Sequence, residues 1–424
     1  MYPNPQDALP LPPHPDVRNY RKRAKDLARA CRTGEDAIRS WATNWVDALL
    51  ELQPQDFPMA RRDAERQIQQ VTDFARDQLT PADGTLAQAQ FVIARAHGFA
   101  SWTRFIRHID GCTRADSGVS AFENAADAMV RGDLPAVQRM LARDPALVRA
   151  RSSREHQATL LHYVSANGVE NYRQKSPPNI VAITRLLLDA GAEVDAEADV
   201  YGGGATTLGL VVTSTPPRAA GVQLALADLL LERGARLDPG SVRACLMNGC
   251  PEAAAHLAAR GVPLTLEEAA GIGRIDIVAS HFEPPRTVST VDASAALMTA
   301  SWYDQRDVIQ LLLDRGVDAG TRAPKDGDTA LHIAAYHGNV ALVELLLDRG
   351  APVNVTDSVY GTPPLVWAMH AWLVENRQDA DAYRTVIQRL ADAGAQVKPE
   401  WLTDPRLRED ADLYLTLSRR VTAT

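Results

Sequence analysis

One short phrase recurs along this 424-residue chain, and it restricts the possible folds more than any other feature. In each copy three leucines are followed by an acidic residue, one further residue, a glycine and a small apolar residue. The full phrase begins at Leu186, Leu229, Leu311 and Leu345, and weaker copies begin at Leu257 and Leu390. A glycine at the same place in every copy supplies the left-handed backbone conformation that ends a helix. The sequence therefore predicts tandem helical repeats that stack on one another.

The most complete copy runs from Thr329 to Asp357 and reads TALHIAAYHGNVALVELLLDRGAPVNVTD. Its Thr-x-Leu-His opening, the alanine pair at Ala334, Gly338 between two helical stretches and the turn at Asn354 closely resemble an ankyrin repeat. The resemblance implies helix pairs joined by hairpin loops, with small alanines on the inner helix and leucines on the outer one. Eight such units are predicted, beginning near Phe122, Thr159, Thr207, Val242, Glu267, Ala295, Thr329 and Thr362.

The resemblance implies an all-α fold in which a small helical domain precedes an ankyrin-type solenoid. We expect a proline-rich tail at residues 1–15, a helical domain at 16–117, the repeats at 118–403, and a capping helix with a short tail at 404–424.

Breaks at Pro54, Pro58 and residues 80–84, with Ser101 as a helix cap, predict four helices in the N-terminal domain. Residues 86–102 of this domain are similar to a helical segment that precedes ankyrin repeats in some bacterial proteins. No activity is implied by that similarity.

The charge balance argues against a polyanionic partner. The chain carries 45 Lys+Arg and 53 Asp+Glu, a formal net charge of −8, so neither nucleic acid nor an anionic membrane is expected to attract it.

Its four cysteines form no CxxC pair and no zinc-ligand spacing, and neither a metal nor a cofactor is expected. We recognise no secretory signal or membrane-spanning run and expect a cytoplasmic protein. Abundant arginine and alanine favour a bacterial source.

Few residues are candidates for catalysis. His162 and His332 occupy the Thr-x-Leu-His openings, where the resemblance implies a structural hydrogen bond to the backbone. His156 is less constrained, but a general base needs a hydrogen-bonded partner that a sequence does not show. The glycines at 202–204 lack the Lys-Ser/Thr ending of a phosphate-binding loop, and the GxSxG and HExxH motifs are missing. No catalytic residue is assigned.

The aromatic residues of the later repeats give a more specific prediction. When the units are aligned on the glycine between their helices, the two positions before it lie at the exposed end of the inner helix, facing the groove. These positions carry Trp302, Tyr303, Tyr336, His337 and His370. Trp and Tyr offer a large apolar surface with a polar group at small entropy cost, and they dominate binding hot spots. The five residues are predicted to form a binding surface, although packing against a neighbouring repeat is the alternative for some.

The sequence thus favours a non-catalytic scaffold that binds another protein through the groove and loops of its repeats, as ankyrin repeat proteins overwhelmingly do. The alternative is an enzyme or a small-molecule binder, with its pocket between the repeats and the N-terminal domain. Insertions at Glu170–Pro178 and Pro216–Pro217, together with His156 and Tyr201, leave that alternative open. Self-association through the N-terminal domain is a third possibility. Fold resemblance alone does not decide among them.

Overall fold

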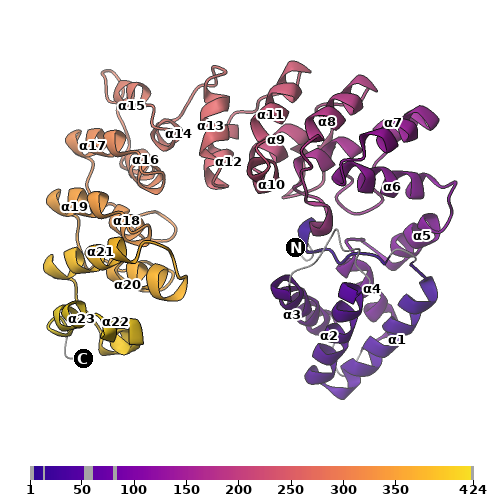
Figure 1. Ribbon diagram of the computed structural model, residues 1–424, viewed down its shortest axis with the longest axis horizontal. Helices are drawn as coiled ribbons and strands as arrows, with labels where there is room; N and C mark the ends of the chain where they lie inside the picture. The colour runs from indigo at the N-terminus through magenta and orange to yellow at the C-terminus, as the bar shows by residue number, and fades with distance from the viewer. Residues whose placement is uncertain (1–3, 13–14, 52–60, 80–83, 422–424) are drawn as a thin grey trace. The chain divides into compact units, whose positions relative to one another are not determined.

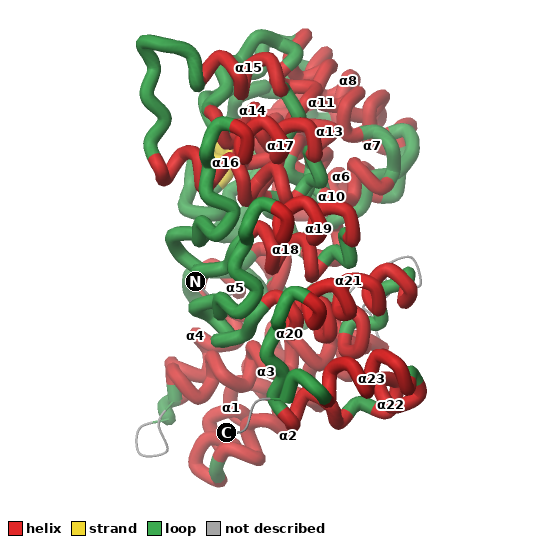
Figure 2. Tube along the Cα trace, turned by 90° about the vertical axis from the view of Figure 1, so that its left-hand side faces the viewer, coloured by secondary structure: helices red, strands yellow, loops and turns green. Residues whose placement is uncertain are grey.

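The computed structural model describes residues 4–12, 15–51, 61–79 and 84–421. These residues are mostly helical, as Figure 2 shows, and their one sheet is a pair of two-residue strands. The predicted all-α fold is therefore confirmed. The chain divides into two compact units, Met1–Ser241 (unit 1) and Val242–Thr424 (unit 2). This division falls within the segment predicted as repeats, and the predicted boundary at residue 117 lies inside unit 1.

Unit 1 opens with the 3-10 helix η1 (Pro5–Asp7) and five α-helices: α1 (Val17–Thr33), α2 (Glu35–Glu51), α3 (Arg61–Gln78), α4 (Leu86–Ala96) and α5 (Trp102–Cys112) (Figure 1). The prediction of four helices was wrong because it missed Gly34. This glycine, with φ of +130°, separates α1 from α2 without a proline. The cap at Ser101 is confirmed, since its hydroxyl accepts a hydrogen bond from the Arg104 N–H. Pro54, Pro58 and residues 80–83 lie outside the described residues.

Three helix pairs complete unit 1. Their members are α6 (Gly118–Val130) with α7 (Leu134–Arg143), η3 (Leu160–Ser165) with α8 (Ile180–Asp189), and α9 (Thr207–Val212) with α11 (Gln223–Glu232). The 3-10 helix η2 (Pro145–Arg149) follows α7. The first predicted insertion contains the 3-10 helix η4 (Asn171–Arg173), and the second lies within α10 (Thr215–Ala219). Strands β1 (Glu197–Ala198) and β2 (Ala205–Thr206) form a hairpin whose turn contains three glycines with positive φ, at 202–204.

Unit 2 consists of five further helix pairs and a C-terminal segment. The pairs are α12 (Ser241–Met247) with α13 (Pro251–Ala258), α14 (Leu266–Gly271) with α15 (Ile275–His281), α16 (Thr290–Trp302) with α17 (Arg306–Asp314), α18 (Ala330–Tyr336) with α19 (Val340–Asp348), and α20 (Pro364–Met369) with α21 (Ala380–Asp392). Figure 1 shows the last four pairs stacked in succession. A π-helical turn, η5 (His370–Val374), extends α20.

The C-terminal cap differs from the single helix that the sequence predicts. After the 3-10 helix η6 (Pro399–Thr403), the chain forms two short helices, α22 (Pro405–Glu409) and α23 (Ala411–Ser418). Asp410 separates them, because its side chain accepts a hydrogen bond from the Leu413 N–H and thereby starts a new helix.

The Thr-x-Leu-His openings tie each repeat to the next one. Nδ1 of His332 accepts a hydrogen bond from the Thr329 N–H at 3.0 Å, and Nε2 lies 3.1 Å from the carbonyl oxygen of Thr362 in the following repeat. His162 makes the equivalent contacts with Thr159 and with the Ala205 carbonyl. Burial lowers the pKa of both imidazoles to about 4, so both are neutral at physiological pH. The structural role predicted for these histidines is confirmed.

Small residues on the inner helices and leucines on the outer helices build the core of unit 2, as the resemblance implies. Ala334, Ala335 and Leu346 are fully buried. Gly338 has φ of +64°, and a Cβ atom there would lie 3.1 Å from the Tyr383 ring, so only glycine allows the next repeat to approach this closely. Among the described residues, no helix combines the length and the apolar character that crossing a bilayer requires.

Candidate functional site

Aromatic rings line up where the inner helices of consecutive repeats end in unit 2. Trp302 is the last residue of α16 and Tyr336 the last of α18, and these two helices pack against each other. The two rings stack with their centroids 6.2 Å apart and an interplanar angle of 21°. His337 meets Trp302 edge-on at 5.0 Å, and Trp367 meets Tyr336 edge-on at 5.9 Å. We call Trp302, Tyr336, His337 and Trp367 the aromatic row.

Part of the aromatic row is open to solvent. Trp302 keeps 45% of its surface exposed. His337 is exposed and Tyr336 is half-buried. Rings that are held by their neighbours and still accessible lose little entropy when a ligand covers them.

Polar contacts hold two rings of the row, Tyr336 and Trp367, in place. The hydroxyl of Tyr336 donates a hydrogen bond to the Glu375 carboxylate at 3.1 Å, and the Arg377 guanidinium lies over the Tyr336 ring at 4.0 Å from its centroid. His370 Nε2 lies 3.6 Å from Glu375 Oε1, which brings this predicted residue to the same surface. At the other side, the Trp367 Nε1–H donates to Asp357 Oδ2 at 3.2 Å.

Asp357 is a structural carboxylate at the base of the row. It is 3% exposed and accepts hydrogen bonds from the N–H groups of Val359, Tyr360 and Thr362. Burial opposes its ionisation, but these hydrogen bonds and that from Trp367 outweigh burial and lower the pKa of Asp357 well below its usual range. Asp357 therefore holds the Trp367 ring in place as a permanent anion.

Tyr303 does not join the other predicted residues. Its hydroxyl donates to the carbonyl oxygen of Leu246, towards the start of unit 2. His337, at the equivalent position one repeat later, packs on Trp302 instead. In the repeat before that of Tyr303, the position equivalent to Trp302 is occupied by Gly271, which has no side chain for Tyr303 to pack against. The structure thus brings four of the five predicted residues together, and their role in binding remains a prediction.

A cavity of about 700 Å³ adjoins the aromatic row. Its walls include the rings of Trp302, Tyr336 and Trp367 and the carboxylates of Asp326 and Asp328. On its outer side lies the exposed turn with Val359 and Tyr360, of which Tyr360 is 77% exposed. We call this cavity the aromatic groove. Sequence reasoning placed Trp367 near the predicted residues, but it missed Asp328 and this turn as parts of the site, because both lie in loops outside the aligned positions.

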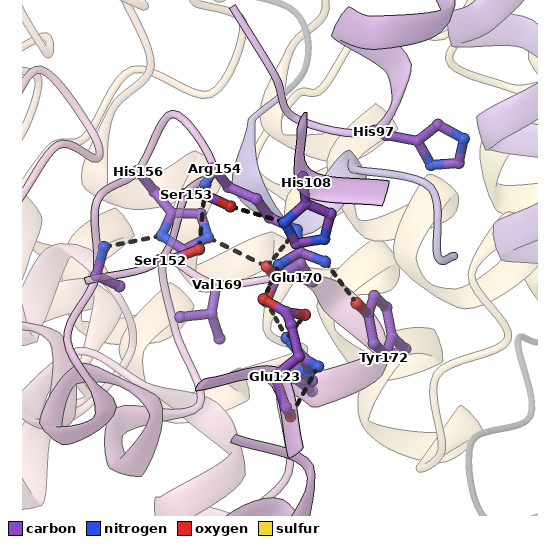
Figure 3. Close-up of polar contacts among 12 residues, drawn as sticks. His97, His108, Glu123, Ser152, Ser153, Arg154, His156, Val169, Glu170 and Tyr172 are labelled. Carbon is purple, nitrogen blue, oxygen red and sulfur yellow. Dashed lines mark hydrogen bonds and ion pairs between the residues drawn. The ribbon is translucent and has the colours of Figure 1, made fainter. Parts of the chain in front are cut away.

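A cluster of charged side chains is buried in unit 1 (Figure 3). Arg154 and Arg173, each 2% exposed, meet Glu170, which is 1% exposed. Arg154 contacts Glu123 at 2.7 Å and Glu170 at 2.8 Å, while Arg173 contacts Glu123 at 2.9 Å and Asp127 at 2.7 Å. We call these five residues the ion cluster. The predicted insertion supplies Glu170 and Arg173, so its role in unit 1 is at least structural.

The ion cluster links the N-terminal helices of unit 1 to the first repeats. Arg154 lies over the Phe99 ring at 5.7 Å, and His108 Nδ1, from α5, is 2.7 Å from the Ser153 hydroxyl. The Glu155 N–H also donates to the carbonyl oxygen of Gly98. These contacts hold the N-terminal helices and the first repeats together within unit 1.

His156 has no free nitrogen for catalysis. Its Nδ1 accepts a hydrogen bond from the Ala158 N–H at 3.1 Å, and its Nε2 lies 3.2 Å from Glu170 Oε1 (Figure 3). The ring is 4% exposed. Tyr201, the other residue named for the alternative function, donates its hydroxyl hydrogen bond to Asn167 Oδ1 at 2.7 Å. Through these hydrogen bonds, the side chains of His156 and Tyr201 stabilise the loops in which they lie.

Cys112 lines a small cavity of about 230 Å³ beside the ion cluster. Cys112 Sγ lies 3.3 Å from His108 Nε2. Burial raises the pKa of Cys112 to about 12, and burial lowers the pKa of His108 to about 4. Both groups are therefore neutral at pH 7, whereas a cysteine nucleophile needs a thiolate. This pair does not support the enzyme alternative.

The comparison with known proteins bears on unit 2. No curated protein is significantly similar to the chain. Residues 266–397 match the family of ankyrin repeats (3 copies), and this segment includes every member of the aromatic row. The part of the chain that forms the aromatic groove therefore consists of ankyrin repeats.

Proposed function

We propose that the protein is a non-catalytic interaction module that binds another protein through the aromatic row and the aromatic groove. Ankyrin repeats generally mediate protein–protein interaction, which supports a protein partner. The observation that carries the proposal is the stacked, solvent-accessible pair Trp302 and Tyr336 on the wall of a cavity. Large rings in such positions supply most of the binding energy at protein interfaces. The proposed setting is the cytoplasm of a bacterium, with neither nucleic acid nor membrane as the partner.

Replacing Trp302 by alanine is expected to weaken partner binding about tenfold or more, because the substitution removes a large exposed ring of the row. The measurement is the affinity of each purified variant for the protein that wild type captures from a native lysate. Photo-crosslinking from position 360, at the rim of the groove, identifies the captured protein that touches this surface.

Leu415→Ala is the matched control, since Leu415 on α23 is an apolar residue of similar exposure, 51%, outside the row. This variant is expected to keep wild-type affinity. Both variants are expected to melt close to wild type, as neither side chain is buried. A partner that binds Trp302→Ala and wild type equally, or a lysate from which position 360 crosslinks no protein, contradicts the proposed function.

A further inference from the structure

The aromatic groove is acidic as well as aromatic. Four carboxylates line it, those of Asp326, Asp328, Asp357 and Glu375, and no lysine or arginine is among its lining residues. Asp357 and Glu375 already accept hydrogen bonds from within unit 2. Asp326 is exposed, and Asp328 is half-buried. Among the described residues, neither of these two carboxylates forms an ion pair with a lysine or an arginine.

Asp328 is the more informative of these two. Among the described residues, its carboxylate forms no ion pair and no hydrogen bond with the side chain of another residue, whereas its backbone carbonyl accepts a bond from the Ala323 N–H. Burial raises the pKa of Asp328, a hydrogen bond from its own backbone N–H offsets part of that effect, and the neighbouring Asp326 and Asp357 raise the pKa further. A half-buried carboxylate without a counter-charge is unfavourable for the free protein. A cation delivered by a ligand would relieve that cost, so this position favours a positively charged partner group.

The surface already contains one arginine bound in the manner expected of such a ligand. Arg377 stacks on Tyr336 at 4.0 Å from the ring centroid, and its Nε–H donates to Glu375 Oε2 at 2.9 Å. A guanidinium is planar, stacks on aromatic rings and pairs with carboxylates in a forked geometry, whereas an ammonium is a strongly hydrated point charge. Trp302 and Asp328 offer a second ring and a second carboxylate on the same cavity.

We infer that the aromatic groove receives an arginine side chain from an extended basic segment of the partner protein, with the guanidinium against the aromatic rings that line the groove and paired with the Asp328 and Asp326 carboxylates. This inference rests on the proposed function and specifies its partner. The net charge of −8 favours the same class of partner at long range. The rings supply contact area, and the carboxylates select the charge.

Peptide selection on the full chain tests this inference. Random dodecapeptides displayed on phage are selected on wild type and then screened against Trp302→Ala to retain those that need the aromatic row. We expect the retained peptides to be enriched in arginine. Synthetic copies in which the arginine is replaced by citrulline, which has the same shape without the charge, are expected to bind at least about tenfold more weakly. Lysine copies are expected to fall between the two.

Asp328→Asn supplies the complementary test on the protein side. The arginine peptides are expected to bind this variant at least about tenfold more weakly than wild type, while Asp348→Asn, with the same change of charge at an exposed site on α19, leaves their affinity unchanged. The asparagine variant is expected to melt no lower than wild type, because it removes a carboxylate whose ionisation burial disfavours. Should it misfold, the citrulline comparison on wild type decides alone.

The possible failures are distinguishable. Retained peptides without arginine, or arginine peptides that bind equally well as citrulline copies, overturn the arginine inference and leave the proposed function standing. A selection in which no peptide depends on Trp302 overturns both.

Discussion

Replacing Arg154 by methionine is expected to lower the free energy of unfolding of unit 1 by about 3–5 kcal/mol, the cost typical of removing one partner from a buried ion pair. Methionine keeps much of the apolar stem and removes the charge. The Glu170 carboxylate, 1% exposed, then loses its contact at 2.8 Å, and Glu123 loses one at 2.7 Å. An anion left without its cation in a buried site is more costly than the loss of a surface salt bridge.

Pulse proteolysis in urea, with fragments of unit 1 followed by mass spectrometry, measures this effect in the full chain. Arg185→Met, at an exposed position on α8, is the control and is expected to change stability by less than about 0.5 kcal/mol. The double variant Arg154→Met/Glu170→Gln is expected to lose less than the sum of the two single variants, because the carboxylate and the guanidinium depend on each other. A cost below about 1 kcal/mol for Arg154→Met would show that the ion cluster is open to water.

Local signals in the sequence carried the prediction of the fold. The glycine that ends each outer helix and the Thr-x-Leu-His openings make contacts within one repeat or with the next one. Their structural roles can therefore be recognised from the sequence of a single repeat. The missed break at Gly34 lacks such a pattern, because a lone glycine between two polar helices has no proline or repeat to mark it.

The candidate sites were harder to predict because their residues come from separate segments. The ion cluster combines α6, the loop at Arg154 and the insertion at Glu170, and a sequence does not show which of many charged residues become buried. The insertion was the one available signal. In the aromatic groove, the repeat spacing placed Trp302 and Tyr336 on adjacent helices, but the direction of Tyr303 depended on Gly271 in the preceding repeat. Asp328 lies on a loop outside the aligned positions, so the repeat pattern gives no indication of its place in the groove.

Acidification below about pH 6.5 is expected to destabilise unit 1 more steeply than unit 2. Burial lowers the pKa of His97 to about 3, and burial lowers those of His108 and His162 to about 4. In the unfolded chain each histidine binds a proton with a pKa near 6.5, whereas in the folded protein the three rings stay neutral to a much lower pH. The folded state therefore has its full stability above pH 6.5 and loses stability as the pH falls towards the pKa values of the folded protein. Each histidine contributes up to about 1.4 kcal/mol per pH unit, and three contribute up to about 4. Among the described residues of unit 2, His332 alone has a pKa lowered as far as about 4.

Hydrogen exchange of the full chain, corrected for the intrinsic effect of pH, is expected to show unit 1 losing protection between pH 6.5 and 4.5 while most of unit 2 retains it. His97→Phe is the informative variant. His97 stacks on Phe105 with an interplanar angle of 8°, so a phenylalanine ring fits the same position and cannot be protonated. The His97→Phe variant loses the hydrogen bond to the Leu9 carbonyl, and this loss is expected to lower the stability of unit 1 at pH 7.5 by about 1 kcal/mol. The variant is also expected to reduce the pH dependence of the stability of unit 1 by about a third. Equal pH dependence in the two units, or an unchanged slope in His97→Phe, would mean that water reaches these rings in the folded protein, and the packing of His97 against Phe105 and Trp45 would then need a different explanation.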